Sequence, residues 1–320
     1  MKFWVRTLRI RDIHEPYQLK EIATTVKEGL DLLGHDAYFD HRQFTGWGTN
    51  AELALFFAGE RQIIIGGNCG TPTTLATIPD GSIVYNYEQA GTFHFSPEYV
   101  GLLRRSEVWD YNLGNIERLK KYNVRARYVP FGYVPGLEVE FQKGWDRDLY
   151  DVMFVGSLHA SSPRAQIIND LKHTGLRVFA SDACYGPARA EAYQQSRLVL
   201  NMHFHQAKIM ETVRCATAMA NHKAVVCQVD RDTVVDELLV PGMACVPFDK
   251  LVETCVALSK DENERRRLER AGYETFLQRK MDDILRPVIN EPDQPNSPSQ
   301  CFKREPDPRL PVYRQVPRAR

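Results

Sequence analysis

The 320-residue sequence has no long apolar run and no excess of charge of either sign. Nowhere do about 18 apolar residues run together, so a transmembrane helix of ordinary length is excluded. The first segment, MKFWVRTLRIRD, also lacks the apolar core of a secretory signal peptide. Lys plus Arg and Asp plus Glu each total 41, which leaves no overall field to attract nucleic acid or an anionic membrane. We therefore expect a cytoplasmic protein without a membrane span, and nucleic acid is not indicated as a partner.

Cysteine pairs and the common cofactor motifs are absent as well. The seven cysteines include no CxxC pair, and Cys215, Cys227 and Cys245 fall inside apolar patterns, which indicates buried free thiols rather than a disulfide framework or a zinc site. The sequence has no GxGxxG and no GxxxxGKS/T, which argues against a dinucleotide dehydrogenase and a P-loop NTPase. Two short DxD patterns, at 146–148 and 230–232, do not follow a strand in the manner of a metal site. The sequence thus predicts no cofactor and no bound metal.

What the sequence does contain is a regular alternation of short apolar strands and amphipathic helices. Such alternation is typical of an α/β fold built on parallel sheets. Strands are expected at 3–8, 37–39, 62–67, 82–86, 108–111, 127–130, 151–155, 176–180, 198–202, 224–227 and 243–246, and helices at 16–33, 50–58, 112–123, 163–173, 187–196, 208–220 and within 251–285.

The alternation is interrupted once, between residues 132 and 148, by glycines, prolines and mixed charges. We therefore expect an N-terminal Rossmann-like domain at 1–133, a linker at 134–148 and a C-terminal Rossmann-like domain at 149–286, with the two domains facing each other across a cleft. Eight of the 18 prolines lie between residues 287 and 317. Residues 287–320 are accordingly expected to form an extended, partly basic tail.

Residues 196–227 form a strand, a polar turn, a helix and a second strand, which is a βαβ unit. Polar side chains gather at its turn, where an open α/β sheet binds its ligands. Lys208 can neutralise a diphosphate there, Glu211 can accept hydrogen bonds from ribose or sugar hydroxyls, and Arg214 follows on the same helix. The alternative for Lys208 and Glu211 is a surface ion pair one helical turn apart, which would contribute only about 0.2–0.5 kcal/mol to stability.

A second candidate for anion binding follows the first strand of the C-terminal half. Gly156 and Ser157 end this strand, and a polar loop leads from them to a helix that opens at Pro163. Glycine allows a diphosphate to approach the backbone, and the N–H groups at a helix start favour an anion. Arg164 either adds positive charge to this site or faces water, and the turn itself is either a phosphate site or an ordinary βα connection.

In the N-terminal half, Glu88 and Gln89 follow a buried strand at the level of the predicted cleft. Glu88 is the best-placed carboxylate for a general base or for an acceptor of sugar-hydroxyl hydrogen bonds. The alternative is a carboxylate that is hydrogen-bonded to a neighbouring loop. Gln89 and His94 are further candidates on the acceptor side of the cleft.

Several strings of the sequence resemble a family of bacterial glycosyltransferase-like proteins of the GT-B type, related to the group 1 and spore-maturation-type transferases. The strings are IVYNYEQ, EVWDYNLGNIERL, ARYVPFGYVP, DVMFVGSLHASSPR and LNMHFHQAKIMETVRCATAMANHKAVV, and they lie within residues 82–229. The resemblance implies a nucleotide-sugar donor held by the C-terminal half, which places Gly156, Ser157, Lys208 and Glu211 at the donor.

The chain departs from that family at one motif. Many group 1 transferases have two glutamates separated by seven residues, the second just before an AMAxGxPVV-like run. Here the run is AMANHKAVV. Ile209 and Thr217 hold the places of the two glutamates, and Glu211 lies two residues past the first of these places.

Our leading hypothesis is a metal-independent transferase that moves a sugar from a nucleotide diphosphate sugar to an acceptor hydroxyl. The alternatives are a non-catalytic GT-B-like module that binds a nucleotide, glycan or protein, and a two-Rossmann epimerase or dehydrogenase. The sequence does not specify the acceptor or the oligomeric state.

Overall fold

The structure is a computed structural model that describes residues 1–8, 19–44, 61–142, 148–159, 162–204 and 208–290. The expected helix at 50–58, the start of the first helix at Pro16 and most of the tail lie outside these residues. Within the described residues, no helix is long and apolar enough to cross a membrane.

The described chain divides into two compact units, one made of residues 1–134 with 280–290 and the other of residues 135–279. The first boundary falls next to the expected end of the N-terminal domain. The second differs from the expectation, because the chain returns to unit 1 at residue 280 rather than staying in unit 2 to residue 286. Residues 287–290, which we expected in the tail, complete the last helix of unit 1.

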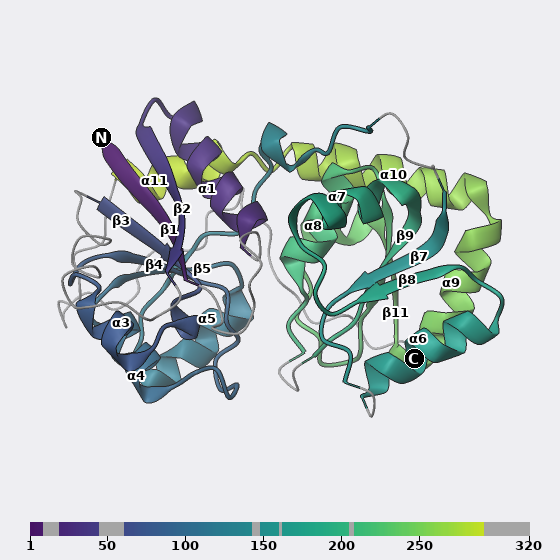
Figure 1. The fold of residues 1–320 in the computed structure, drawn as a ribbon, viewed down its shortest axis with the longest axis horizontal. Helices are drawn as coiled ribbons and strands as arrows, with labels where there is room; N and C mark the ends of the chain where they lie inside the picture. The colour runs from purple at the N-terminus through teal and green to yellow at the C-terminus, as the bar shows by residue number, and fades with distance from the viewer. Residues whose placement is uncertain (9–18, 45–60, 143–147, 160–161, 205–207, 291–320) are drawn as a thin grey trace. The chain divides into compact units, whose positions relative to one another are not determined.

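Unit 1 is a six-stranded parallel sheet in the order β2-β1-β3-β4-β5-β6 with helices around it (Figure 1). Its strands are β1 Lys2–Leu8, β2 Asp36–Phe44, β3 Arg61–Ile65, β4 Ile83–Asn86, β5 Glu107–Asp110 and β6 Arg127–Tyr128. Its helices are α1 Lys20–Leu32, α3 Pro72–Thr77, α4 Pro97–Arg104, α5 Leu113–Leu119 and α11 Met281–Asn290, with single 3-10 turns at Gly67–Cys69 and Lys120–Tyr122.

Two short helices of unit 1, α3 and α4, were not predicted. Each begins with a hydroxyl residue followed by proline, and the hydroxyl accepts the hydrogen bond of a backbone N–H in the first turn, as from Tyr99 N to Ser96 Oγ at 3.2 Å. Proline fits the first helical position because its missing N–H would have no partner there. These caps are readable in the sequence, but the segments are too short to show a helical period.

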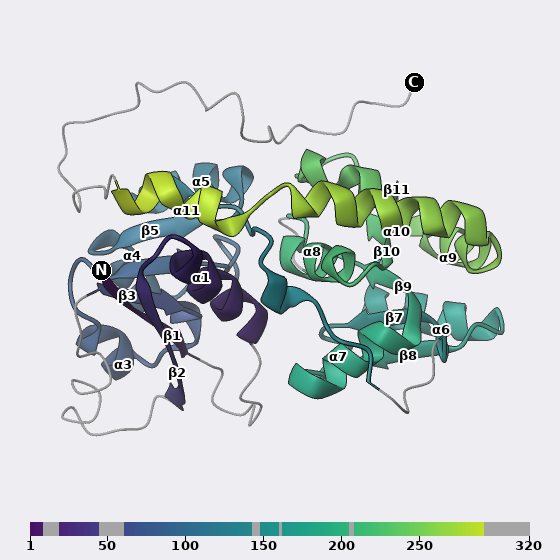
Figure 2. The same ribbon diagram turned by 90° about the horizontal axis from the view of Figure 1, so that it is seen from above.

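The last helix, α11, packs beside the first, α1, although nearly the whole chain separates them (Figure 2). Glycines allow this approach: a Cβ on Gly29 of α1 would lie 2.8 Å from Met281 Cγ, and one on Gly132 would lie 2.8 Å from Met281 Cα. Tyr133 O accepts a hydrogen bond from Met281 N at 3.0 Å. Thus α11 is an integral part of unit 1.

Unit 2 is a five-stranded parallel sheet in the order β11-β10-β9-β7-β8. Its strands are β7 Tyr150–Val155, β8 Val178–Ser181, β9 Ser196–Asn201, β10 Ala224–Gln228 and β11 Met243–Val246. Its helices are α6 Pro163–His173, α7 Gly186–Gln195, α8 Thr212–Ala220, α9 Leu251–Lys260 and α10 Glu262–Leu277, with 3-10 turns at Pro135–Leu137, Glu237–Gly242 and Phe248–Lys250. Apolar side chains of β7, β9, β10, α6 and α9 form its core.

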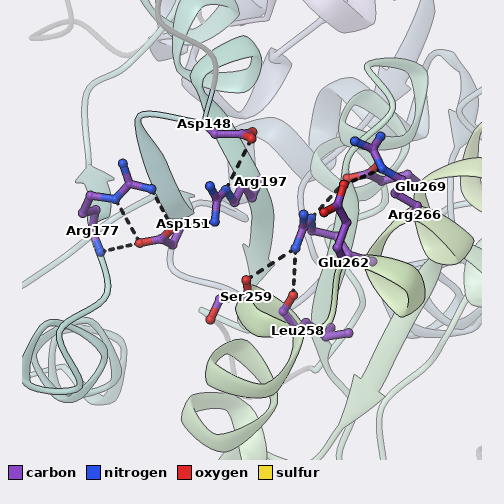
Figure 3. Close-up of polar contacts among 10 residues, drawn as sticks. Asp148, Asp151, Arg177, Arg197, Leu258, Ser259, Glu262, Arg266 and Glu269 are labelled. Carbon is purple, nitrogen blue, oxygen red and sulfur yellow. Dashed lines mark hydrogen bonds and ion pairs between the residues drawn. The ribbon is translucent and has the colours of Figure 1, made fainter.

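The charged groups at the amino edge of this sheet are paired with one another (Figure 3). Asp151 at the start of β7 accepts hydrogen bonds from Arg177 Nη2 at 2.8 Å and from the Arg177 backbone at 2.9 Å. Arg197 lies 3.4 Å from Asp151 Oδ1 and 3.5 Å from Asp148 Oδ2. The hydrogen bond from Arg177 lowers the pKa of Asp151 below its usual range. This edge is therefore a charge-compensated structural network.

The predicted helix at 208–220 begins four residues later than expected. Lys208 has a left-handed backbone with φ 48°, and Ile209 forms a bridge to Val234 in the loop after β10. Ile209 is fully buried, so its side chain anchors this segment to the core in an extended form. The prediction that Lys208 and Glu211 lie one helical turn apart was therefore wrong.

Part of the expected linker is tied firmly to unit 2. The Asn221 side chain at the end of α8 donates to Leu137 O at 3.0 Å and accepts from Val139 N at 2.8 Å. Gln194 Nε2 donates to Val139 O at 2.7 Å. Residues 137–139 are thus held by α7 and α8.

Candidate functional site

The strand order of unit 2 places its topological switch point between β7 and β9. From β7 the chain passes to β8 on one side, and β9 then pairs with β7 on the other side. In open α/β sheets, ligands bind outside the carboxyl ends of the strands at such a point. The residues at these ends are Val155 and Gly156 after β7 and Asn201, Met202 and His203 after β9.

Arg164, in the first turn of α6, spans this switch point. Its guanidinium donates to Met202 O at 2.6 Å, to His203 O at 3.0 Å and to Ser157 O at 3.4 Å. The side chain is only 4% exposed. Burial, together with the neighbouring charge of Arg214, lowers the pKa of Arg164 to about 9, which still leaves a cation at neutral pH.

Arg214, in the first turn of α8, spans the same point from the other side. Its Nε donates to Val155 O at 3.1 Å and its Nη1 to Asn201 Oδ1 at 2.6 Å. Within the described part of the chain, Nη2 of Arg214 has no hydrogen-bond partner, and neither arginine forms an ion pair with a carboxylate. Guanidinium groups that are not ion-paired with a carboxylate and have an N–H donor to spare are the kind of group that binds a phosphate or carboxylate.

Gly156 lies directly against both guanidinium groups. A Cβ at this position would sit 3.0 Å from Arg214 Nη2, 3.1 Å from Phe154 Cζ and 3.4 Å from Arg164 Nη1. The Phe154 ring supports both cations, since the guanidinium carbons of Arg164 and Arg214 lie 5.4 and 5.3 Å from its centre. A side chain at 156 would therefore crowd both guanidinium groups.

Glu211 lies near this pair as the residue just before α8. Its negative charge raises the pKa of Arg164, against the larger effect of burial, and it raises the pKa of His203 in the same way. The structure thus brings Gly156, Arg164, Glu211 and Arg214 together. Ser157 contributes its backbone oxygen to Arg164.

Lys208, the predicted diphosphate contact, is held by carboxylates instead. Its Nζ donates to Asp232 Oδ1 at 2.8 Å and lies 3.5 Å from Asp230 Oδ2. The hydrogen bond to Asp232 raises the pKa of Lys208 and lowers that of Asp232. The second DxD pattern therefore neutralises a lysine in this structure.

His203 is engaged within the protein. Its Nε2 lies 3.1 Å from Thr233 Oγ1, and its backbone N–H donates to Gln228 Oε1 at 3.0 Å. Burial lowers the pKa of His203, so its imidazole is neutral at pH 7. His205, two residues further along the chain, lies outside the described residues.

In unit 1, the Glu88 carboxylate is the acceptor for its own loop. It accepts hydrogen bonds from Asn68 Nδ2 at 3.0 Å, Gln89 N at 3.0 Å and Thr92 Oγ1 at 2.7 Å. These bonds match the alternative that the sequence left open, in which the carboxylate organises a neighbouring loop. Gln89 is buried, and His94 is half-buried with its ring centre 3.8 Å from that of Phe93.

A buried carboxyl, Asp110, lies at the end of β5 beside this loop. It accepts hydrogen bonds from Asn86 Nδ2 at 2.6 Å, Asn115 Nδ2 at 2.7 Å and Asn112 N at 2.9 Å. Burial raises the pKa of Asp110 to about 7 even though these three donors lower it. Asn115 also donates to Glu88 O at 3.0 Å, so the network links the ends of β4 and β5.

Two residues of the arginine site were not predicted from the sequence, Phe154 and Asn201. Phe154 lies two positions before Gly156, so both face the same side of β7, a relation that strand periodicity contains. Asn201 is the first polar residue after the apolar run of β9 and orients Arg214. A polar residue that ends a buried strand is a usable signal, although it does not identify its partner.

No protein-family model matches the sequence, and a search of curated proteins returned no match. Solved structures do match over 91% of the chain. They include AviGT4, a glycosyltransferase involved in avilamycin A biosynthesis (TM-score 0.57, 12% identity, 96% of that chain), and an alpha-glucosyltransferase in complex with UDP and a 13-mer DNA (0.61, 10%, 98%). A third is Anabaena HepE in complex with UDP (0.55, 12%, 99%).

At 10–12% identity these likenesses establish the fold and not the activity. Together with the two parallel sheets, they show that the chain has the GT-B type of α/β fold, as the sequence predicted.

Proposed function

We propose that the protein is a glycosyltransferase that moves a sugar from a nucleotide diphosphate sugar to an acceptor hydroxyl. The observation that carries this proposal is the arginine pair: Arg164 and Arg214 both bridge the carboxyl ends of β7 and β9 next to Gly156. The fold supports it, because the structural neighbours include glycosyltransferases, two of them in complex with UDP.

In the proposed reaction, the bond between the anomeric carbon and the β-phosphate oxygen breaks as the acceptor oxygen bonds to that carbon. The leaving diphosphate gains negative charge, and guanidinium groups aimed at it stabilise that charge in the transition state. Arg164 and Arg214 fill this role, and Glu211 accepts from ribose or sugar hydroxyls. The acceptor proton passes to the departing phosphate or to a carboxylate of unit 1, for which Glu88 remains the candidate predicted from the sequence.

Two fixed guanidinium groups supply the positive charge that a divalent cation supplies in metal-dependent transferases. We therefore propose that transfer does not require a metal. Among the described residues, no group of three or more His, Cys, Asp or Glu side chains is arranged to hold a metal ion.

The test is a calorimetric titration of the full-length protein with UDP-, GDP-, ADP- and dTDP-sugars, followed by assay of nucleotide release with and without EDTA. Saturable binding of one donor with EDTA-resistant release of the diphosphate supports the proposal. Absence of binding for every donor at protein concentrations well above micromolar contradicts it.

One observation favours a second function, a non-catalytic module that binds the same ligand. The Glu88 carboxylate is already occupied by Asn68, Gln89 and Thr92, and Ile209 and Thr217 stand where many related transferases have glutamates. This function predicts that a nucleotide sugar binds and is recovered intact after prolonged incubation with a range of acceptors.

A further inference from the structure

A basic surface of unit 1 surrounds Tyr122, in the 3-10 turn after α5. Between residues 104 and 125, two ion pairs lie at the surface, Arg105 with Asp80 and Lys120 with Glu117. The other charged surface side chains of the segment are all bases: Arg104, Arg118, Lys121 and Arg125. The other two acids of the segment, Glu107 and Asp110, are buried. The zero net charge of the chain therefore hides a local excess of positive charge.

One hydrogen bond and the course of the chain bring these bases to Tyr122. Arg104, at the end of α4, donates from Nε to Tyr122 O at 2.9 Å, which brings it to the turn that carries Lys120 and Lys121. Asn123 then reverses the chain with a left-handed φ of 54°, and Arg125 follows at the surface. The bases thus come from two elements and meet at one turn.

An exposed aromatic side chain adjoins the same turn. The loop Gly91–Phe95 packs on Tyr122: the Phe95 ring lies 4.9 Å from the Tyr122 ring, and a Cβ on Gly91 would lie 3.4 Å from Tyr122 Oη. Phe93 in this loop is 76% exposed, the highest value among the large apolar side chains that the structure places, and its ring lies 3.8 Å from that of His94. We call Phe93, His94, Arg104, Lys120, Lys121 and Arg125 the Tyr122 patch.

We propose that the Tyr122 patch binds a single-stranded segment of nucleic acid, with Phe93 stacking on a base and the basic side chains contacting phosphates. An aromatic face beside a positive groove is how proteins hold single strands, and each base stacked on an aromatic ring contributes about 1–3 kcal/mol. A single strand is favoured over a duplex because only an unpaired base offers its face to Phe93.

The small exposed apolar area of the patch argues against a lipid surface as its partner. Interfacial membrane binding grows with the apolar area that is buried. Phe93 is the only exposed large apolar side chain in the described part of this loop and turn, and it lies against His94. One ring suffices for stacking on a base but buries little area in a bilayer.

This inference goes beyond the proposed function, since strand binding requires neither a donor nor turnover. The experiment measures fluorescence anisotropy of a labelled mixed-sequence DNA strand of about 20 nucleotides, long enough for one binding site, against the full-length protein. The variants are Phe93→Ala, Phe93→Tyr and Lys121→Gln. The matched controls are Leu32→Ala, another exposed apolar residue of unit 1, and Lys172→Gln, an exposed lysine on α6 of unit 2.

We expect Phe93→Ala to weaken binding of the DNA strand by about 5- to 150-fold, the equivalent of one stacked base. Phe93→Tyr, which keeps an aromatic ring, should bind the strand as wild type does. Lys121→Gln should weaken binding less and reduce the slope of log K against log salt by about 0.7, the value for one phosphate contact in a single strand. The controls should match wild type.

Three outcomes overturn the inference. The first is no binding of the strand at low salt. The second is binding that Phe93→Ala and Lys121→Gln affect no more than the controls do. The third concerns a parallel assay with anionic lipid vesicles: wild type binds the vesicles, and Phe93→Ala loses vesicle binding but keeps its affinity for DNA. None of these results bears on nucleotide-sugar binding by unit 2, so failure here is distinguishable from failure of the proposed function.

Discussion

Arg164 and Arg214 share one aromatic ring: their guanidinium carbons lie 5.4 and 5.3 Å from the centre of Phe154. Two cations so close repel each other, and the charge of Arg214 contributes to the lowered pKa of Arg164. The backbone oxygens of Val155, Met202 and His203 offset part of this cost by accepting their N–H groups. Under the proposed function, the diphosphate of the donor would relieve the remainder.

The Arg214→Ala variant should weaken UDP binding by about 10- to 150-fold, the range for a hydrogen bond to a charged group. Lys208→Ala, which removes a cation already paired with Asp232, should change affinity by less than about threefold, as for an exposed ion pair. Calorimetry with UDP measures both, and thermal melting checks that each variant is folded. Equal losses in the two variants would show that the sequence-based assignment of Lys208 was correct after all.

Gly156→Ala should lower UDP affinity with little loss of secondary structure. The new Cβ would lie 3.0 Å from Arg214 Nη2 and 3.1 Å from Phe154 Cζ, so the guanidinium group has to move away from the approach to the site. Gly101→Ala is the control for the added methyl group alone, since Gly156 also has a φ of 157° that strains any side chain there. A Cβ at Gly101, in the middle of α4, meets no atom within 4 Å, and alanine should stabilise the helix by about 0.5–1 kcal/mol. Unchanged UDP affinity in Gly156→Ala would rule out close approach of the ligand to this glycine.

The Asp151–Arg177 pair should stabilise unit 2 fully above about pH 4 and progressively less below it. Arg177 lowers the folded-state pKa of Asp151 beneath the unfolded value of about 3.9, so the stabilisation is present above that value and is lost as pH falls through the folded pKa. Asp151→Asn should cost about 1 kcal/mol at neutral pH, a modest value because Arg177 is half-exposed, and the difference from wild type should shrink as pH falls through the folded-state pKa.

Scanning calorimetry across this pH range measures the effect. Glu253→Gln, which removes an exposed i,i+3 partner of Lys250, is the control and should leave the melting temperature unchanged at every pH. A difference between Asp151→Asn and wild type that does not shrink as pH falls to the acid limit of folding would falsify this assignment.

Asp110 should have the opposite pH dependence. Because burial raises its folded-state pKa to about 7, folded unit 1 holds a proton that the unfolded chain has released, so stability should fall as pH rises from about 4 to about 7 and then level off. Asp110→Asn should remove this slope. It should also cost about 1–3 kcal/mol, because its amide N–H₂ would face one of the three donors that now point at the carboxyl.

Tryptophan emission during urea unfolding is a suitable probe for Asp110, since Trp4, Trp47 and Trp109 are three of the four tryptophans and lie in residues 1–134. Glu117→Gln, an exposed acid of the same unit, is the control. The assignment fails when wild type and Asp110→Asn show the same slope between pH 4 and pH 7.

The parts of the fold that follow a period were predictable from the sequence. Helix α6 and strand β11 have the bounds that their patterns predicted. Helix α6 has one apolar face and β11 is a short apolar run, and residues that favour turns or helix ends flank both. The start of α8 was not predictable in this way. Lys208, Ile209 and Met210 fit a helical pattern, but Lys208 has a left-handed φ of 48° and the tertiary bridge between Ile209 and Val234 keeps this segment out of the helix.

The same contrast holds for the candidate site. Gly156, Arg164 and Arg214 were predicted from residue type and position, and the structure brings them together. The partners of Lys208 come from the loop after β10, which no local pattern connects to it. His222 illustrates a third case: it stands where the AMAxGxPVV-like run has glycine, and its φ of 53° at the end of α8 explains why glycine is preferred there.

The packing of α11 on α1 sets an order of folding during synthesis. Unit 1 begins at the first residue, but its glycine-lined contact with Met281 cannot form until the last helix has left the ribosome. At about 5–20 residues per second, the intervening unit takes on the order of ten seconds to be made. The described part of unit 2, within residues 135–279, is made before the last helix and can complete its core first, so the half that is synthesised first is the last to reach its final stability.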